Sequence, residues 1–97
     1  MRFVLLRKSQ KAGKKFDVVL ADSDGKYHIV SFGAAGASDM TQHKDPKRRE
    51  SYLLRHGARE NWTRSGILTA GFWSRWLLWN KPTLESSLAD VRRKFHL

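Results

Sequence analysis

The side chains in this sequence that could do chemistry are concentrated between residues 44 and 64. Seven lysines and arginines occur there against three acids. Cations at this density repel one another unless solvent or phosphate relieves them, so the segment predicts contact with an anionic partner. The residues expected to make that contact are Lys44, Lys47, Arg48, Arg49, Arg55, Arg59 and Arg64. A solvated face of an amphipathic helix is the other interpretation, and the pattern leaves both open.

Patterns for catalysis and metal binding are missing. No Gly-x-Ser-x-Gly elbow activates a serine, and no two of the four histidines have the spacing of paired metal ligands. Asp17, Asp22, Asp24 and Asp39 could form a nuclease carboxylate cluster, but a hairpin turn explains Asp22 and Asp24 more simply. We therefore predict no enzyme activity, no catalytic residue, no metal and no cofactor.

The small-residue run from Gly33 to Ser38 resembles a phosphate-binding loop only in composition. Such a loop ends in Gly-Lys-Ser/Thr at the start of a helix, and here no lysine follows Gly36 until Lys44. Two interpretations remain. The run is a tight crossover from strand to helix in which bulky side chains would clash, or its exposed amides contact a backbone phosphate.

Composition and charge limit the class of protein. The chain has 97 residues, of which 40% are hydrophobic and 11% aromatic, which is enough for one modest core and predicts a single domain over 1–97. A net charge of +10 favours nucleic acid, an anionic membrane face or an acidic protein surface as partner. With no cysteine, the chain has no disulfide and no thiolate metal site.

Targeting segments are not expected. The apolar run at the N-terminus is too short for a signal peptide, and no stretch reaches the roughly 18 apolar residues of a membrane span. We expect a protein that is not secreted, has no membrane span, and remains in the cytoplasm or nucleus or is packaged from there.

Three short β-runs open the chain and predict an antiparallel meander over residues 1–32. They cover residues 2–8, 16–20 and 26–32, and the Ser23-Asp24-Gly25 turn joins the last two. One face of such a small sheet must be covered, so the following helices should pack on it. Within each run, alternate side chains should point to the same face of the sheet. The expected groups are Phe3 with Leu5, Phe16 with Val18 and Leu20, and Tyr27 with Ile29.

A Gly/Ala-rich loop over 33–44 and a helical part over 45–97 should follow. Asp45 and Pro46 begin a helix over 46–56 that ends at Gly57. A second helix is expected over 67–79, and Thr83 caps a third with an apolar stripe. Leu53 and Leu54 are the best core candidates of the first helix. The fold class is therefore α+β, with the sheet packed on Leu53, Trp76, Leu84, Leu88 and Val91.

The tryptophans of the second helix are either core or an interface. Tryptophan and arginine are typical interface anchors, which makes Trp73, Arg75 and Trp79 the candidate docking residues. Shallow membrane insertion is a third interpretation. Because Trp76 lies between Phe72 and Trp79 on the richer apolar face of an α-helical wheel, we expect Trp76 to be core and Trp73 to be the more exposed.

Four strings together resemble a family of short basic proteins of nucleocytoplasmic large DNA viruses that infect algae and amoebae. They are Ser-Phe-Gly-Ala-Ala-Gly-Ala-Ser-Asp (31–39), Thr-Gln-His-Lys-Asp-Pro-Lys-Arg-Arg (41–49), Tyr52 with Arg55-His56, and Trp-Asn-Lys-Pro-Thr-Leu (79–84). Met40 departs from the aromatic residue expected there. The resemblance implies a viral setting and a virion or genome-associated role, but no mechanism.

The resulting prediction is a non-enzymatic viral protein that binds nucleic acid phosphates largely without sequence specificity. Its alternative is a minor capsid or other virion component that docks on capsid proteins through the Trp-rich helix. An acidic viral protein surface is the third partner considered. The expected location is the virion or the cytoplasm and nucleus of the infected cell, and the sequence sets no oligomeric state.

Overall fold

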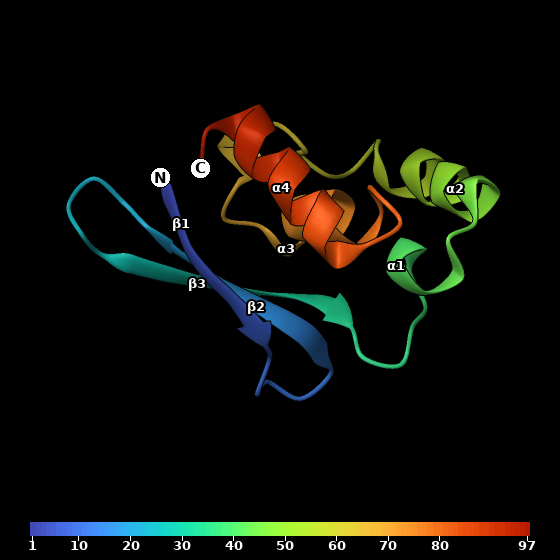
Figure 1. The fold of residues 1–97 in the computed structure, drawn as a ribbon, viewed down its shortest axis with the longest axis horizontal. Coiled ribbons are helices and arrows are strands. Elements are labelled where there is room, and N and C mark those ends of the chain that lie inside the picture. The colour runs from blue at the N-terminus through green and yellow to red at the C-terminus, as the bar shows by residue number, and fades with distance from the viewer.

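A three-stranded antiparallel sheet opens the chain, and helices follow it. The computed structural model describes residues 1–97, and its strands β1 (Arg2–Lys8), β2 (Lys14–Ala21) and β3 (Tyr27–Ala34) lie in the order β1-β2-β3. The helices are α1 (Met40–His43), α2 (Pro46–His56), α3 (Ala70–Trp73) and α4 (Leu84–Phe95). This confirms the α+β class and the meander. Figure 1 shows α3 and α4 over one face of the sheet, with α1 and α2 beyond the end of β3.

The first strand contains a bulge that changes which of its side chains reach the core. Phe3 pairs with Leu20 and Leu5 with Val19, so Val4 is an extra residue in β1. The bulge interrupts the alternation, and Phe3 packs against the core while Leu5 is 40% exposed. The expectation that Phe3 and Leu5 share a face was therefore wrong.

The β2–β3 turn forms where the sequence predicts it. The Asp22 carboxylate accepts hydrogen bonds from the N–H groups of Asp24 and Lys26, and Gly25 has a φ of 81°. The His28 ring, followed by these backbone donors, holds the pKa of Asp22 below its usual value. Asp22 is thus a turn residue, and the structure contains no carboxylate and histidine group that could hold a metal ion.

One central core joins the sheet to the helices. The sheet contributes its inward side chains, and the segment from Ile67 to Leu78 contributes most of the rest. The buried members are Val18, Leu20, Val30, Phe32, Ile67, Phe72, Trp73, Leu77, Leu78 and Val91. Leu84, Leu88 and Phe95 of α4 are half-buried against this core, which confirms the α4 stripe and its Thr83 cap.

Helix α2 has the predicted bounds but packs through a different side chain. Leu54 is 77% exposed and Leu53 is only half-buried, so neither belongs to the central core. Tyr52 is the buried residue of α2. The prediction of Leu53 and Leu54 as core was wrong because α2 lies beside the sheet and not on it (Figure 1). Gly57 ends the helix with a right-handed φ of −59°, whereas the sequence suggested the usual left-handed cap.

The Gly/Ala-rich connection is shorter than predicted. Strand β3 continues to Ala34, and α1 occupies the last part of the predicted 33–44 loop. Asp39 caps α1 in a capping box with Gln42. The Asp39 carboxylate accepts from the backbone N–H of Gln42, and the Gln42 side-chain oxygen accepts from the backbone N–H of Asp39. The connection between β3 and α1 therefore comprises residues 35–39.

The second predicted helix begins later and ends as a π-helix. A 3₁₀-helix (Arg64–Gly66) precedes it, Thr69 caps α3, and a π-helix (Ser74–Leu78) continues it. The bond from the Trp79 N–H to the Ser74 carbonyl closes the wide turn. Burial follows this wider spacing, because Phe72 and Leu77 are five residues apart and both fully buried.

The π-turn reverses the expected roles of two tryptophans. Trp73 is fully buried, and its Nε1–H donates to the Ile67 carbonyl at 2.7 Å. Trp76 is only half-buried, with its Nε1–H on the Trp62 carbonyl at 3.0 Å. The prediction that Trp76 is core and Trp73 more exposed was wrong, since an α-helical wheel does not describe a segment with five-residue spacing. None of the helices combines the length and the apolar composition that a membrane-spanning helix requires.

Asp90 links α4 to the turn that follows the π-helix. Its carboxylate accepts from Asn80 Nδ2 at 2.8 Å and from the Arg93 guanidinium at 2.7 Å. The Asn80 hydrogen bond above all, and then Arg93, hold the pKa of Asp90 below its usual value against the opposing effect of burial. The Asn80 carbonyl in turn accepts from Arg49 of α2 at 2.8 Å. One polar chain therefore connects α2, the turn and α4.

Trp73→Ala should destabilise the fold more than Trp76→Ala. Removing the fully buried ring leaves a cavity and should lower the free energy of unfolding by about 3–5 kcal/mol. The loss at half-buried Trp76 should be smaller. Chemical denaturation of both variants measures this, and Trp73→Phe provides a milder change if Trp73→Ala does not fold. A larger loss for Trp76→Ala would contradict the assignment.

Asp90→Asn should remove a pH-dependent part of the stability. The folded-state pKa of Asp90 is lowered, so its contribution is fully present above the ordinary aspartate pKa of about 3.9 and is lost as pH falls through the lower folded value. We expect the variant to lose about 1–3 kcal/mol near neutral pH. Denaturation curves from neutral to acidic pH should show the gap to the parent protein narrowing below pH ~4. A gap that widens on acidification would refute the assignment.

Candidate functional site

A cavity of about 480 Å³ opens between the end of the sheet and helix α2. We call it the basic cleft. Its sheet wall is formed by the start of β2 and the end of β3, its opposite wall by α2, and its remaining lining by the 35–39 connection and the segment from Ala70 to Trp79. The charged side chains that line it are Lys14, Lys15, Asp39, Arg48, Arg55 and Glu60, together with the ring of His56.

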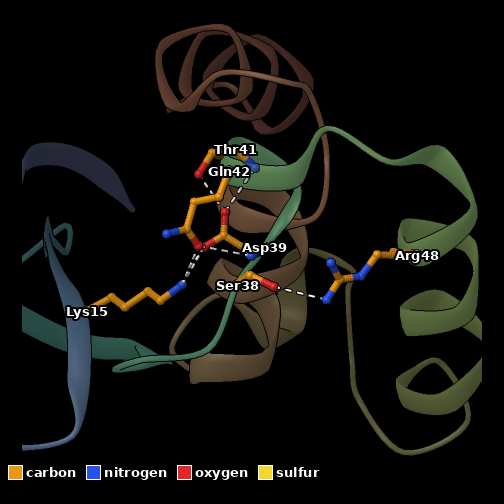
Figure 2. Close-up of polar contacts among 6 residues, drawn as sticks. All are labelled: Lys15, Ser38, Asp39, Thr41, Gln42 and Arg48. Atoms are coloured by element: carbon orange, nitrogen blue, oxygen red, sulfur yellow. Dashed lines mark hydrogen bonds and ion pairs between the residues drawn. The ribbon is translucent and has the colours of Figure 1, made fainter.

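The connection between β3 and α1 is anchored to both walls of the cleft. Figure 2 shows Lys15 reaching the carboxylate of Asp39, with 2.5 Å between Nζ and Oδ2, and Arg48 donating to the Ser38 hydroxyl at 3.0 Å. Asp39 also accepts from the Thr41 N–H at 2.9 Å. The Asp39 side chain is buried and that of Lys15 is half-buried, so these two opposite charges offset each other, whereas the hydroxyl that Arg48 contacts carries no charge.

Gly33 lets the connection leave the sheet at the floor of the cleft. Its φ is 80°, and a Cβ at this position would lie 2.8 Å from Leu78 Cδ1 and 3.1 Å from Lys15 Cβ. Gly36 has a similar φ of 85°, but a Cβ there would meet nothing within 4 Å. The predicted clash of bulky side chains therefore applies to Gly33 and not to Gly36.

A column of three stacked rings, with a fourth ring packed against its end, holds α2 in place. Tyr52 stacks on Trp79 with centroids 4.4 Å apart and planes 5° apart, and His56 stacks on Tyr52 at 4.2 Å. His43 packs against Trp79 with centroids 5.3 Å apart, but its plane is tilted by 50° and the two rings are not stacked. Burial, and then the negative charge of Glu60, raise the pKa of the Tyr52 phenol, so it remains neutral. Together the four rings run from the end of α1 to the end of α2.

His43 has a structural role at the turn between α1 and α2. Its Nδ1 accepts the N–H of Asp45, the residue that caps α2, at 2.9 Å. The next residue, Lys44, has a left-handed φ of 54°. His43 therefore shapes the entry to α2, as the sequence suggested.

The seven predicted contact residues divide into two groups. Three of them bind backbone carbonyls elsewhere in the fold: Lys44 donates to Pro82 at 2.8 Å, Arg49 to Asn80 at 2.8 Å, and Arg64 to Phe95. The others lie on α2 or just after it and are exposed; they are Lys47, Arg48, Arg55 and Arg59. None of the seven has a carboxylate oxygen within 4 Å, so their charges are unpaired.

The cleft brings together two of these cations with one that the sequence did not reveal. Arg48 and Arg55 line its α2 wall, and Lys14 of β2 lines the sheet wall. Lys47 and Arg59 lie outside it. The sequence did not reveal Lys14 because its position depends on the pairing of strands. Lys14 pairs with Ala34, so the start of β2 lies beside the end of β3, where the 35–39 connection begins.

Glu60 is a second cleft residue that the sequence did not reveal. Its Oε1 accepts from the Trp62 Nε1–H at 3.0 Å, and its Oε2 lies 3.4 Å from His56 Nδ1. A Cβ at Gly71 would lie 2.8 Å from this carboxylate, so the glycine gives Glu60 its place against α3. The one sequence signal for the position of Glu60 is Gly71, which permits close packing. A single glycine in a helix does not indicate which residue packs against it.

The predicted docking residues of the Trp-rich segment are mostly internal. Trp73 is fully buried, and Trp79 is half-buried with one face on Tyr52, which corrects the prediction of Trp73 as an exposed anchor. Arg75 donates to the Trp79 carbonyl at 2.7 Å and lies 4.4 Å above the ring of Trp76. Burial, followed by repulsion from Arg49, lowers the pKa of Arg75.

Comparison with known proteins gives one match. The model of a family of unknown function, DUF5754, matches residues 4–56, which is more than half of the chain. The match covers the sheet, the connection, α1 and α2, and so both walls of the basic cleft. No curated protein and no solved structure matches the chain. The family description names no activity or source, and the viral resemblance stays a prediction.

Gly33→Ala should destabilise the protein more than Gly36→Ala. Both substitutions place an alanine at a positive φ, which costs about 1–2 kcal/mol. Only the methyl group at residue 33 would also overlap Leu78 and Lys15, so that variant should lose more. Chemical denaturation of the two variants gives the difference directly. Equal losses would show that the close approach at Gly33 contributes nothing.

Proposed function

The chain belongs to the DUF5754 family of unknown function, and we propose that it is a non-enzymatic basic protein that binds nucleic acid through phosphate contacts. The binding surface is the outer face of α2 together with the basic cleft. Lysine and arginine contact phosphates whatever the base, so binding is largely independent of sequence.

The observation that carries this proposal is the unpaired charge around α2. Six of the nine acids are engaged in turns, helix caps and hydrogen bonds to groups other than the cations of α2; these are Asp17, Asp22, Asp39, Asp45, Glu60 and Asp90. The cations of α2 have no carboxylate partner, and the resulting positive potential attracts anions.

The spread of these cations favours a polymer over a small anion. Lys14, Arg48 and Arg55 lie in the cleft, while Lys47 and Arg59 lie outside it on or beside the same helix. A single phosphate would reach only one part of this surface, whereas a nucleic acid backbone offers a series of charges along its length.

A virion structural role is the second candidate, and the structure supports it less. The docking surface predicted for this role is the Trp-rich segment from Phe72 to Trp79. In the structure Trp73 is buried and Trp79 is stacked on Tyr52, so neither ring is free to dock. The viral setting, with capsid proteins or an acidic viral surface as partners, depends on the sequence resemblance. Under either candidate we place the protein in the virion or the infected cell.

Reversing the charge of Arg55 in the cleft and of Arg59 just outside it should abolish binding without unfolding the protein. Arg55 and Arg59 have no hydrogen bond to another element, so Arg55→Glu with Arg59→Glu should leave the melting temperature nearly unchanged. Titration of a labelled oligonucleotide at several salt concentrations measures the affinity. For the parent protein on duplex DNA, the log–log slope should be about −0.9 for each phosphate contacted.

The matched control is Arg2→Glu with Lys26→Glu. Both residues are exposed and lie at the end of the sheet away from the cleft. Arg2 pairs with Ala21 there, and Lys26 precedes Tyr27, which pairs with Ala21 from the other side. This variant has the same net charge and should keep most of the affinity. Equal loss in both variants would mean that net charge alone drives binding, and tight binding that ignores salt would refute the proposal.

A further inference from the structure

We infer that the basic cleft takes a single nucleic acid strand, with one unpaired base inside it, in preference to a duplex. This inference rests on the proposed function and specifies its ligand. Four features support it: the size of the cleft, cations on opposite walls, an accessible carboxylate and an exposed ring at the end of the aromatic column.

The cleft has the size of one nucleotide. Its volume of about 480 Å³ falls within the range of roughly 300–1,000 Å³ typical of sites for small organic ligands. A duplex cannot place a base in this cavity, because its bases are paired and stacked between two backbones and present only their edges in the grooves. A strand that has no complement can place one residue in such a cavity.

Cations lie on both sides of this space. Lys14 comes from β2, and Arg48 and Arg55 come from α2, so a phosphate between the walls is reached from two directions. Lys15 also lines the cleft, but Asp39 neutralises it. A duplex resting on the outside could contact Lys47 and Arg59 but could not bring its phosphates between the two walls.

Glu60 gives the cleft a group that suits a base and not a phosphate. A carboxylate repels phosphate, yet it accepts hydrogen bonds from base amino groups such as N4 of cytosine. A carboxylate offers about four acceptor positions; the Trp62 Nε1–H uses one of them, and His56 Nδ1 lies 3.4 Å from the other oxygen. The Glu60 side chain is 25% exposed, so the remaining positions can be reached. In a duplex the Watson–Crick edges of the bases are already paired, and the amino groups exposed in the major groove cannot reach a carboxylate inside a cleft that the duplex does not enter.

The aromatic column offers a stacking surface in the same place. His56 forms its last ring, lines the cleft, and has a side chain that is 39% exposed. Stacking of bases on aromatic rings is the usual way in which proteins hold single strands without reading their sequence. A base on His56 would lie beside Glu60, with its phosphate toward Arg55.

The test compares a short DNA strand with the duplex of the same sequence. Fluorescence anisotropy at one fixed salt concentration should show that the single strand binds about tenfold more tightly than the duplex. A tenfold difference corresponds to the free energy of stacking one base on an aromatic ring. Ala37→Leu should remove this preference, because exposed Ala37 lines the cleft and a branched aliphatic side chain there occupies its space without changing charge or offering a ring for stacking. Ala89→Leu, on the exposed face of α4, is the control and should keep the preference.

A second pair of variants separates the cleft from the outer surface. Lys14→Ala should weaken binding of the single strand several-fold more than binding of the duplex. Lys47→Ala removes the same charge outside the cleft and should weaken both forms equally. If strand and duplex bind the parent protein equally, or Ala37→Leu leaves the preference unchanged, the cleft assignment fails while the proposed function stands. If neither form binds, both fail.

Discussion

The stacking of Tyr52 on Trp79 is the contact on which the rest of the site depends. Helix α2 contributes no side chain to the central core, and it is joined to the other elements by this pair of parallel rings and by hydrogen bonds from Arg48 and Arg49. Hydrogen bonds from partly solvated arginines contribute little net stability, whereas burying two aromatic faces removes much apolar area from water. The distance between the walls of the basic cleft is therefore set mainly by the rings.

The π-helix is what allows one segment to serve both the core and this stack. Leu77 and Leu78 are buried in the core, and Leu78 lies close to Gly33. The next residue, Trp79, faces α2. The wider turn brings Phe72 and Leu77 to one side, five residues apart, so the segment faces the sheet along its length and meets Tyr52 at its end. The same geometry buries Trp73 at the centre of the fold.

Local signals explain which parts of the fold the sequence predicted. The 23–25 turn, Asp45 before Pro46, and Thr83 before the last apolar stripe each act within a few residues, and all three mark the elements correctly. The roles of Trp73 and Trp76 depend on a π-turn that has no local residue signature. Leu54 is exposed although it is strongly apolar, because burial depends on what lies opposite a helix face. Lys14 and Glu60 reach the cleft only through tertiary packing, which local pattern does not encode.

The positive charge of the chain affects its stability and, under the proposed function, couples that stability to the binding of a polyanion. Lys44, Arg49 and Arg64 donate to carbonyl oxygens, and such neutral acceptors satisfy the donors without cancelling their charge. The cations that hold the fold together therefore add to the same positive field as the exposed ones, and their mutual repulsion opposes the compact state. A polyanion that binds only the folded protein relieves this repulsion and stabilises the fold by mass action. The unpaired cations are thus a cost to the free protein, which binding of a phosphate backbone would offset under the proposed function.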